Sequence, residues 1–200
     1  MKGSLIIIGF FIAGIICGIT GIIPADFLGD NVSFYALCAL MFCVGMSIGC
    51  DADTVKKFKS LDKRMMLLPI ATIIGTLAGC AAARCILPHH SITECLAIGS
   101  GMGYYSLSSI FITQLKGAEP GTVALLANIM REIITLVAAP LLARYFGKLA
   151  PISAGGATSM DTTLPIITKA SGNEFAIVSV YHGFVTDFSV PFLVTFFCTL

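Results

Sequence analysis

Charged residues are scarce in this 200-residue chain: only 12% are Asp, Glu, Lys or Arg, against roughly 25% in soluble domains. Hydrophobic residues make up 56%, and the mean hydropathy is +0.94. Apolar runs near the ~20 residues needed to cross a bilayer follow one another and leave little chain for a soluble domain. The composition therefore predicts an all-α, polytopic membrane helix bundle, with the lipid bilayer as its surroundings and one transmembrane domain over residues 1–200.

Signatures of several other functional classes are missing. No basic patch lies outside residues 51–64, so nucleic acid is not an expected partner. None of the eight cysteines forms a CxxC pair or a Cys/His cluster with metal-ligand spacing, so we expect no metal, disulfide or cofactor. Neither a GxGD nor a GxSG pattern occurs, and we expect the chain not to be an enzyme. The N-terminal apolar run is too long for a signal peptide and predicts a retained first membrane helix.

Hydropathy predicts about seven membrane segments: residues 4–23, 32–50, 65–87, 93–115, 121–143, 150–170 and 173–198. The loop at residues 51–64 is rich in lysine, which predicts that this loop and the N-terminus are cytoplasmic. Seven crossings would then place Arg144 and Lys148 outside, against the charge rule. Either the 93–115 segment is re-entrant, or these two cations reach the interface along their flexible stems.

Two of the segments contain helix-breaking residues. Residues 99–109 read GSGMGYYSLSS, and residues 153–165 read SAGGATSMDTTLP. Interrupted backbone inside a bilayer must be buried in protein or line a cavity, and in transporters such breaks bind ions and polar substrates. We therefore predict two broken helices, with Gly101 and Ser106 as candidate binding residues in the first. For residues 99–103 an alternative stays open, in which the glycines only let helices pack closely.

Four ionisable residues lie inside apolar segments, where such residues by default mark a functional site. They are Arg131, Glu132, Asp161 and Asp187. Arg131 and Glu132 point about 100° apart on a helix, and Glu132 shares a polar stripe with Asn128, so we expect Glu132 to face the interior. Asp187 is the expected counter-ion of Arg131, either as a structural pair or within the transport site. A further alternative pairs Arg131 with Glu132 through a local distortion.

Asp161 and Glu132 are the expected functional pair. Two buried carboxylates without enough cations can bind a cationic ligand or exchange it for protons, which is the physical basis of proton/cation antiport. Polar groups beside them would complete a substrate- or ion-binding site. These candidates are Asn128 beside Glu132, and Thr158, Ser159, Thr162 and Thr163 beside Asp161.

Four of these stretches together resemble the bacterial lysine exporter family LysO. They are GSGMGYYSLSS, ANIMRE at residues 127–132, GGATSMDTTLPII at residues 155–167 and HGFVTDFSVPFLV at residues 182–194. The resemblance implies an inner-membrane secondary transporter that exports L-lysine and toxic analogues such as thialysine. It also implies that Glu132 and Asp161 form the intramembrane acidic site. Protons or sodium would be the coupling ion.

The resemblance covers only the later two-thirds of longer family members. Either a small membrane partner chain supplies additional helices, or the chain forms a homo-oligomer, and we favour the partner chain. Two functional alternatives remain. One is a monovalent cation/proton antiporter that uses the same carboxylates, and the other is a subunit of a split two-chain exporter that is inactive alone.

Overall fold

The structure, a computed structural model, describes residues 16–17, 19–20, 42, 46, 62–86 and 91–200. It divides the chain into two compact units, Met1–Asp51 and Ala52–Leu200. The predicted segments 4–23 and 32–50 and most of the basic loop lie outside the described residues, so they stay predictions, as does the single domain. Everything below concerns the second unit.

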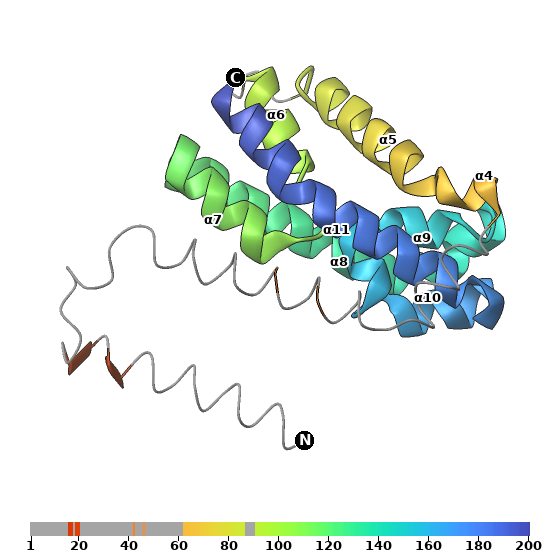
Figure 1. The fold of residues 1–200 in the computed structure, drawn as a ribbon. Helices are drawn as coiled ribbons and strands as arrows, with labels where there is room; N and C mark the ends of the chain where they lie inside the picture. Colours follow the sequence, from red (N-terminus) through yellow and green to blue (C-terminus); the bar gives the residue numbers. More distant parts are fainter. Residues whose placement is uncertain (1–15, 18, 21–41, 43–45, 47–61, 87–90) are drawn as a thin grey trace. The chain divides into compact units, whose positions relative to one another are not determined.

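The described part of this unit is helical, which confirms the predicted all-α class (Figure 1). Its elements are α4 (Lys63–Met66), α5 (Leu68–Ala83), α6 (Ile92–Gly99), α7 (Tyr105–Lys116), α8 (Ala118–Phe146), α9 (Ala150–Gly155), the 3-10 helix η2 (Gly156–Met160), α10 (Leu164–Ser171), the 3-10 helix η3 (Asn173–Phe175) and α11 (Ala176–Thr199). Three stretches among the described residues are long and apolar enough to cross a membrane: Arg64–Ala83, Ala118–Phe146 and Asn173–Thr199.

Helix starts follow local sequence signals. At α6 the Ser91 Oγ accepts a 3.0 Å hydrogen bond from the Glu94 N–H, and the Glu94 carboxylate accepts one of 2.9 Å from the Ser91 N–H, which forms a capping box. Pro69 and Pro165 lie in the first turns of α5 and α10, where the missing N–H has no intrahelical partner to lose. Both predicted breaks are confirmed, at residues 100–104 and 156–163.

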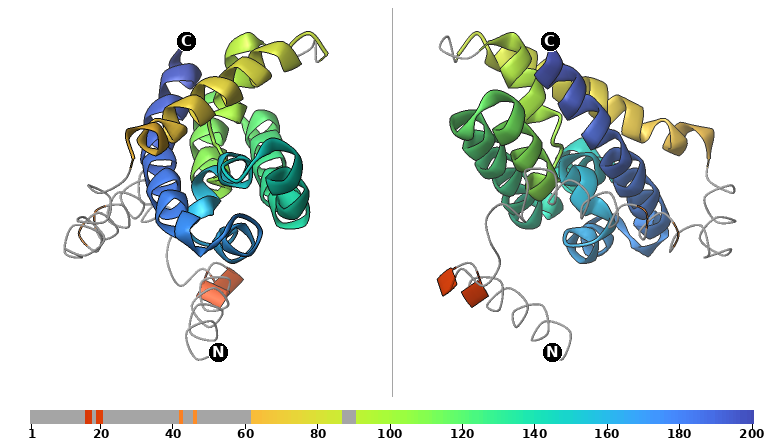
Figure 2. Two further views of the ribbon diagram at one scale, coloured as in Figure 1. Left: turned by 90° about the vertical axis from the view of Figure 1, so that its right-hand side faces the viewer. Right: turned by 60° about the vertical axis from the view of Figure 1, so that its left-hand side comes forward.

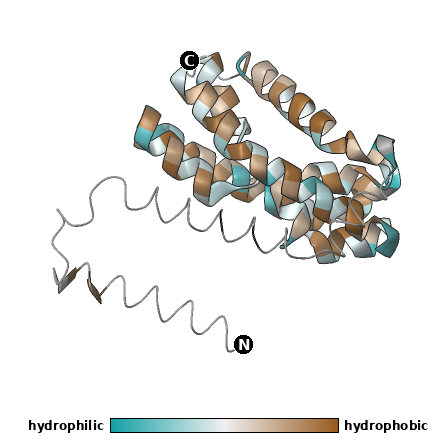
Figure 3. Ribbon diagram, in the orientation of Figure 1, coloured by the Kyte–Doolittle hydropathy of each residue, from teal (hydrophilic) through white to brown (hydrophobic). Residues whose placement is uncertain are grey.

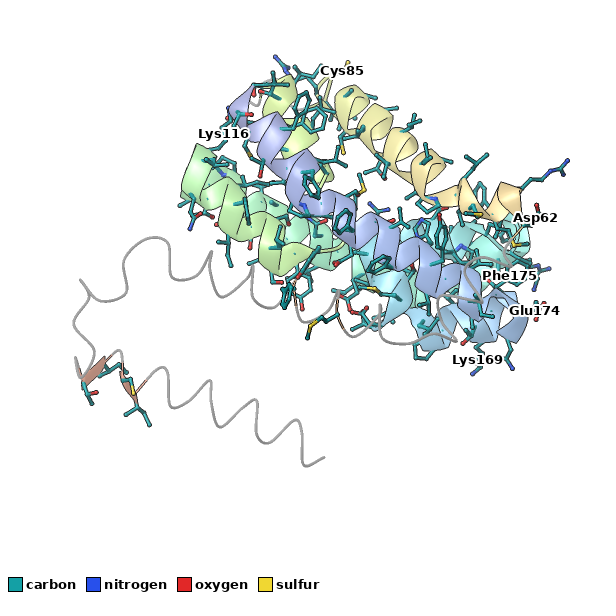
Figure 4. All side chains as sticks on the ribbon, viewed as in Figure 1. Asp62, Cys85, Lys116, Lys169, Glu174 and Phe175 are labelled. Atoms are coloured by element: carbon teal, nitrogen blue, oxygen red, sulfur yellow. The ribbon has the colours of Figure 1, made fainter. Side chains whose placement is uncertain are left out.

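The first broken segment is a hairpin. Figure 4 shows Cys85 and Lys116 at one end of the bundle, and Asp62, Lys169 and Glu174 at the other. Helix α6 therefore runs inward from the end where α5 stops, and α7 returns to that same end. We call α6, α7 and the tip at residues 100–104 the first hairpin.

The second broken segment enters from the opposite end. The Ser171 Oγ, at the end of α10, donates a 2.8 Å hydrogen bond to the Lys148 carbonyl just before α9. Ile152, Ile167 and Val178 also form one apolar cluster, which joins α9, α10 and the start of α11. We call α9, η2, α10 and the tip at residues 156–163 the second hairpin. In both views of Figure 2 the C-terminus lies beside α6 and away from α10, so the two hairpins point toward each other.

The return of the chain in the first hairpin changes the end of the bundle at which Arg144 and Lys148 are expected. Because the first hairpin turns back, α8 runs to the end where α5 begins. Lys148, just after α8, donates a 3.1 Å hydrogen bond to the Ala170 carbonyl, and Figure 4 shows the neighbouring Lys169 at the same end as Asp62. Arg144, in the last turn of α8, therefore also lies toward this end. The re-entrant alternative for residues 93–115 is therefore the one that the structure adopts. Residues 150–170 also turn back, so the predicted crossing by this segment is wrong. Hydropathy gives the length of an apolar run and does not give the direction in which the chain continues.

Apolar side chains cover much of the surface of the bundle, and many polar side chains are buried within it beside an apolar core. Large apolar side chains are exposed on its surface, among them Ile74 (62% exposed), Val137 (75%) and Phe192 (63%). Most of α5 is coloured as hydrophobic in Figure 3, and hydrophilic residues gather at the two ends of the bundle. Asn128, Thr135 and many Ser and Thr side chains are buried instead. A bilayer accounts for this distribution, since lipid solvates the apolar faces and polar groups must find partners inside.

Candidate functional site

The two hairpin tips touch each other. The Ala157 N–H in the second tip donates a 2.9 Å hydrogen bond to the Met102 carbonyl in the first. Gly156 has a φ of +62°, and a Cβ at this position would collide with the Met102 carbonyl. Gly103 has a φ of +99°, and its Cβ would lie 3.1 Å from the Gly155 carbonyl oxygen. The glycines therefore break the helices and also let two backbones approach closely.

Two side chains of α8 are bonded to the two tips. The Asn128 Oδ1 accepts a 2.7 Å hydrogen bond from the Gly103 N–H. The Arg131 Nε donates to the Ala154 carbonyl at 2.8 Å, and its Nη2 donates to the Ser153 carbonyl at 2.9 Å. These carbonyls belong to the C-terminal end of α9, where carbonyls lack intrahelical partners and a cation is favoured. Both residues, predicted to bind substrate or ion, therefore have bonds that position the hairpins.

The expected ion pair between Arg131 and Asp187 is not formed in the described part of the chain. The Arg131 guanidinium donates to the two α9 carbonyls and, at 3.4 Å, to the Thr76 Oγ1. The free carbonyls of a helix C-terminus carry partial negative charge, so this buried cation is stabilised without a carboxylate. Glu132, the alternative partner, does not accept any of these hydrogen bonds from Arg131.

Asp187 lies near Asp161 instead. Its side chain is 8% exposed on α11, and its carboxylate interacts electrostatically with that of Asp161 in the second tip. Tyr104, in the first tip, lies near enough to interact with both charges. Asp161 is exposed, and its Oδ1 accepts a hydrogen bond from the Thr162 N–H. No ion pair among residues 62–86 and 91–200 neutralises either carboxylate. Two neighbouring carboxylates without a bonded cation favour the binding of a cationic ligand.

Glu132 is half-buried on the inward face of α8. Of its neighbours on this face of α8, Asn128 is 3% exposed and Thr135, about one turn further on, is fully buried. The Thr135 Oγ1 donates a 2.9 Å hydrogen bond to the Arg131 carbonyl. The described contacts do not join Glu132 to Asp161, and their expected pairing stays a prediction.

Three of the four predicted hydroxyls of the second tip, those of the threonines, divide into two groups. The Thr158 Oγ1 donates to the Gly155 carbonyl, and the Thr163 Oγ1 donates to the Thr158 carbonyl, both at 2.9 Å. These two hydroxyls shape the tip itself. Thr162 is exposed, and its Oγ1 lies 3.3 Å from the Asp161 carboxylate. Of these three, Thr162 is the one placed to meet a ligand beside Asp161.

The two predicted residues of the first hairpin differ in their surroundings. A Cβ at Gly101 would lie 2.5 Å from the Asn128 Nδ2 and 2.7 Å from the Ser108 Oγ. Gly101 therefore allows close packing against α8, which is the alternative left open for residues 99–103. Ser106 is exposed in the first turn of α7.

The structure also links Ser159, a predicted site residue, to a buried chain of polar side chains through His182. His182 is fully buried, with its Nε2 2.9 Å from the Thr72 Oγ1 and its Nδ1 3.1 Å from the Ser159 Oγ. The Thr72 hydroxyl donates to the Ser153 Oγ at 3.0 Å, and both residues line an open groove of about 370 Å³ between α5 and α9. One signal was present: Thr72 and Thr76, one turn apart, mark a single face of the otherwise apolar α5.

Comparison with known proteins identifies the family. Residues 8–198 match the family model described as lysine exporter LysO. The chain belongs to this family. Lysine exporter LysO of Escherichia coli (strain K12) is 33% identical over 194 residues, which cover 97% of this chain and 64% of the relative. A putative lysine exporter of Haemophilus influenzae is 34% identical over 169 residues, 84% of each chain. No solved structure matches.

Membership of the LysO family confirms the resemblance and, with the long apolar helices, makes the chain an integral membrane protein. The family is named for export and not for catalysis. The chain spans less than two thirds of the length of the E. coli relative.

Proposed function

We propose that this chain exports L-lysine across the bacterial inner membrane by antiport with protons or sodium. The observation that carries the proposal is the pair of Asp161 and Asp187 where two opposed hairpin tips meet, without a cation bonded to either among the described residues. Broken helices that meet near midmembrane are where transporters bind ions and polar substrates. The names of the two relatives supply the substrate.

The chemistry of lysine fits this arrangement. Its two ammonium groups need carboxylates, which Asp161, Asp187 and the half-buried Glu132 provide. Its own carboxylate needs N–H donors, and α7 begins at Tyr105 without a side-chain cap, so the N-terminus of α7 presents such donors. Thialysine carries the same charged groups as lysine and would use the same contacts. The coupling ion would occupy the carboxylates when lysine leaves them.

The distribution of basic residues favours an orientation. Arg64, Arg144, Lys148 and Lys169 lie at the end of the bundle where α5 begins, and the basic stretch at residues 51–64 directly precedes α5 in the sequence. Because Lys and Arg accumulate on the cytoplasmic side, this end would be cytoplasmic. The N-terminus would then be cytoplasmic too.

A second chain would complete the transporter. More than a third of the E. coli relative has no counterpart in this alignment, since 64% of it is covered. We favour a small membrane partner chain that supplies the corresponding helices, over a homo-oligomer. In that case the chain would be inactive alone.

The test is growth of a lysine-exporter-deficient bacterium on thialysine. The strain carries this chain with or without the neighbouring reading frame, and in each setting with Asp161→Asn. Glu174→Gln is the matched control, because it neutralises an exposed carboxylate at the far end of the second hairpin. We expect Asp161→Asn to remove protection at equal membrane abundance, and Glu174→Gln to keep it.

Full protection by Asp161→Asn would place the site elsewhere. If no form of the chain protects, vesicles decide between the remaining functions. A sodium-dependent pH change that is indifferent to lysine would favour the monovalent cation/proton antiporter instead.

A further inference from the structure

His182 is a buried titratable residue that the proposed lysine site does not use. It is fully buried on α11, between η2 and α5. Each ring nitrogen faces a hydroxyl: Nδ1 faces the Ser159 Oγ at 3.1 Å, and Nε2 faces the Thr72 Oγ1 at 2.9 Å. Hydroxyls differ from carbonyls and carboxylates because one atom can both donate and accept.

The surroundings of Ser159 determine which nitrogen carries the permanent proton. The Ser159 Oγ is 2.7 Å from the Gly156 carbonyl and 3.0 Å from the Ser179 carbonyl, as well as 3.1 Å from the His182 Nδ1. A hydroxyl has one proton to donate. If Nδ1 also accepted, three acceptors would compete for it. Nδ1 therefore carries hydrogen and donates to Ser159, and Nε2 is the atom that gains or loses a proton.

On the Nε2 side, the hydrogen bonds among His182, Thr72 and Ser153 can form whether or not Nε2 carries a proton. When Nε2 is bare, Ser153 donates to Thr72, and Thr72 donates to Nε2. When Nε2 carries a proton it donates to Thr72, and Thr72 donates to Ser153. In the structure Thr72 is the donor to Ser153, and the geometry of the His182–Thr72 bond suits either donor. The two states differ by one proton and by the rotation of two hydroxyls. Neither state leaves His182, Thr72 or Ser153 without a hydrogen-bond partner.

Few ionisable side chains lie near the His182 ring. Helices α9 and η2 contain no ionisable side chain, and α5 contributes only the Cys80 thiol. Helix α8 brings the Arg131 charge near the ring. On α11 itself, Tyr181 directly precedes His182 in the sequence, and Asp187 follows His182 by five residues. Among these described groups no carboxylate is bonded to the ring, so no ion pair fixes it in the charged form.

We propose that His182 binds the coupling proton, which enters and leaves from the α5–α9 groove through Ser153 and Thr72. This rests on the proposed function and deepens it by naming the coupling ion. A proton from water in the groove bonds to the Ser153 Oγ, the Ser153 proton moves to Thr72, and the Thr72 proton bonds to Nε2. Release reverses these transfers. Ser159 belongs to the second tip, so the charge on the ring acts directly on the segment that carries Asp161.

The first test compares driven and undriven lysine movement by the full chain in liposomes, with any partner chain it needs. His182→Asn keeps an amide donor toward Ser159 but binds no proton, and Thr72→Val keeps the shape without the hydroxyl. Both variants should lose stimulation of lysine flux by an imposed pH gradient while keeping lysine–lysine exchange at equal pH. Thr72→Ser should keep the stimulation. So should Thr186→Val, which removes a buried hydroxyl that has no partner among the described residues.

Unchanged stimulation in His182→Asn would overturn the inference. Wild-type protein that moves no lysine in either assay would instead count against the proposed function. The second test is independent of transport: ¹⁵N-histidine NMR of the full chain, with His89→Gln and His90→Gln used to assign signals. We expect a neutral ring with hydrogen on Nδ1, and Nε2 gaining its proton on acidification. A neutral ring with hydrogen on Nε2 would also overturn the inference.

Discussion

Asn128 and Arg131 lie three residues apart on α8, and each is bonded to the tip region of a different hairpin. Asn128 accepts from the Gly103 N–H at 2.7 Å, and Arg131 donates to the Ala154 carbonyl at 2.8 Å. Residues three apart share one helix face. Less than one turn of a single membrane-spanning helix therefore fixes the meeting point of two segments that enter from opposite ends of the bundle.

Asn128→Leu should destabilise the first tip. The substitution keeps the shape of the side chain but leaves the buried Gly103 N–H without an acceptor, which costs about 1–3 kcal/mol. Equilibrium unfolding of the purified protein in mixed micelles measures this cost. Thr122→Val is the control, because it removes an exposed hydrogen bond to the Ala118 carbonyl on the same helix. Equal stability of the two variants would show that Asn128 does not stabilise the tip.

Arg131→Lys should weaken the second hairpin although it keeps the charge. A lysine ammonium cannot reproduce the planar fork that reaches two α9 carbonyls at once. We expect a loss of about 1.5–3 kcal/mol in unfolding free energy, the usual range for hydrogen bonds to charged groups. Because Arg131 positions the hairpin, the lysine concentration that half-saturates the remaining transport should not change. A large rise in that concentration would assign Arg131 to the substrate instead.

The helix breaks could be predicted from sequence because single residues encode them. Gly99 to Gly103, Gly155, Gly156 and Pro165 stand out in apolar segments, and the structure breaks both helices there. The direction of the chain after each break could not be predicted from hydropathy, although the positions of Arg144 and Lys148 left a re-entrant path open for residues 93–115. Hydropathy gives the length of an apolar run, and a run that turns back inside the bilayer has the same composition as one that crosses.

The partners of the polar residues were harder to predict than the residues themselves. A buried arginine in an apolar segment indicates the need for a counter-ion, and the sequence pattern predicts a carboxylate as the partner of Arg131. Its actual partners are backbone carbonyls, which every residue carries and no pattern marks. His182 meets Thr72 across 110 positions of the chain. Only the packing of α5 against α11 brings these two side chains together.

Gly156→Ala should disrupt the contact between the tips. Its φ of +62° is strained for alanine, and the new methyl group would collide with the Met102 carbonyl. Transport should be lost, with a lower unfolding temperature. Gly79→Ala is the matched control, since it lies in α5 with nothing within 4 Å of its Cβ position, and alanine in a helix is more stable by about 1 kcal/mol. A Gly156→Ala protein with wild-type transport would contradict the close approach of the tips.

Asp187→Asn should stabilise the protein while it reduces lysine export. The Asp187 carboxylate is buried and is repelled by Asp161, so neutralising it removes an unfavourable burial of charge. Single stabilising substitutions commonly gain about 0.5–2 kcal/mol, and for a chain of this size 1 kcal/mol corresponds to about 2–4 °C. Thermal unfolding and thialysine resistance measure the two effects. Lower stability in Asp187→Asn would show that a cation already neutralises this carboxylate.

The two ends of each hairpin should be accessible from the same side of the membrane. In a chain whose eight cysteines are replaced by alanine, single cysteines at Ser91 and Lys116 report the first hairpin, and cysteines at Lys148 and Lys169 report the second. An impermeant maleimide should label Ser91→Cys and Lys116→Cys from one side, and Lys148→Cys and Lys169→Cys only from the other, because each hairpin turns back at its tip. If residues 93–115 crossed the bilayer, Ser91→Cys and Lys116→Cys would be labelled from opposite sides. That result would contradict the hairpin, and it would return Arg144 and Lys148 to the side opposite the basic loop.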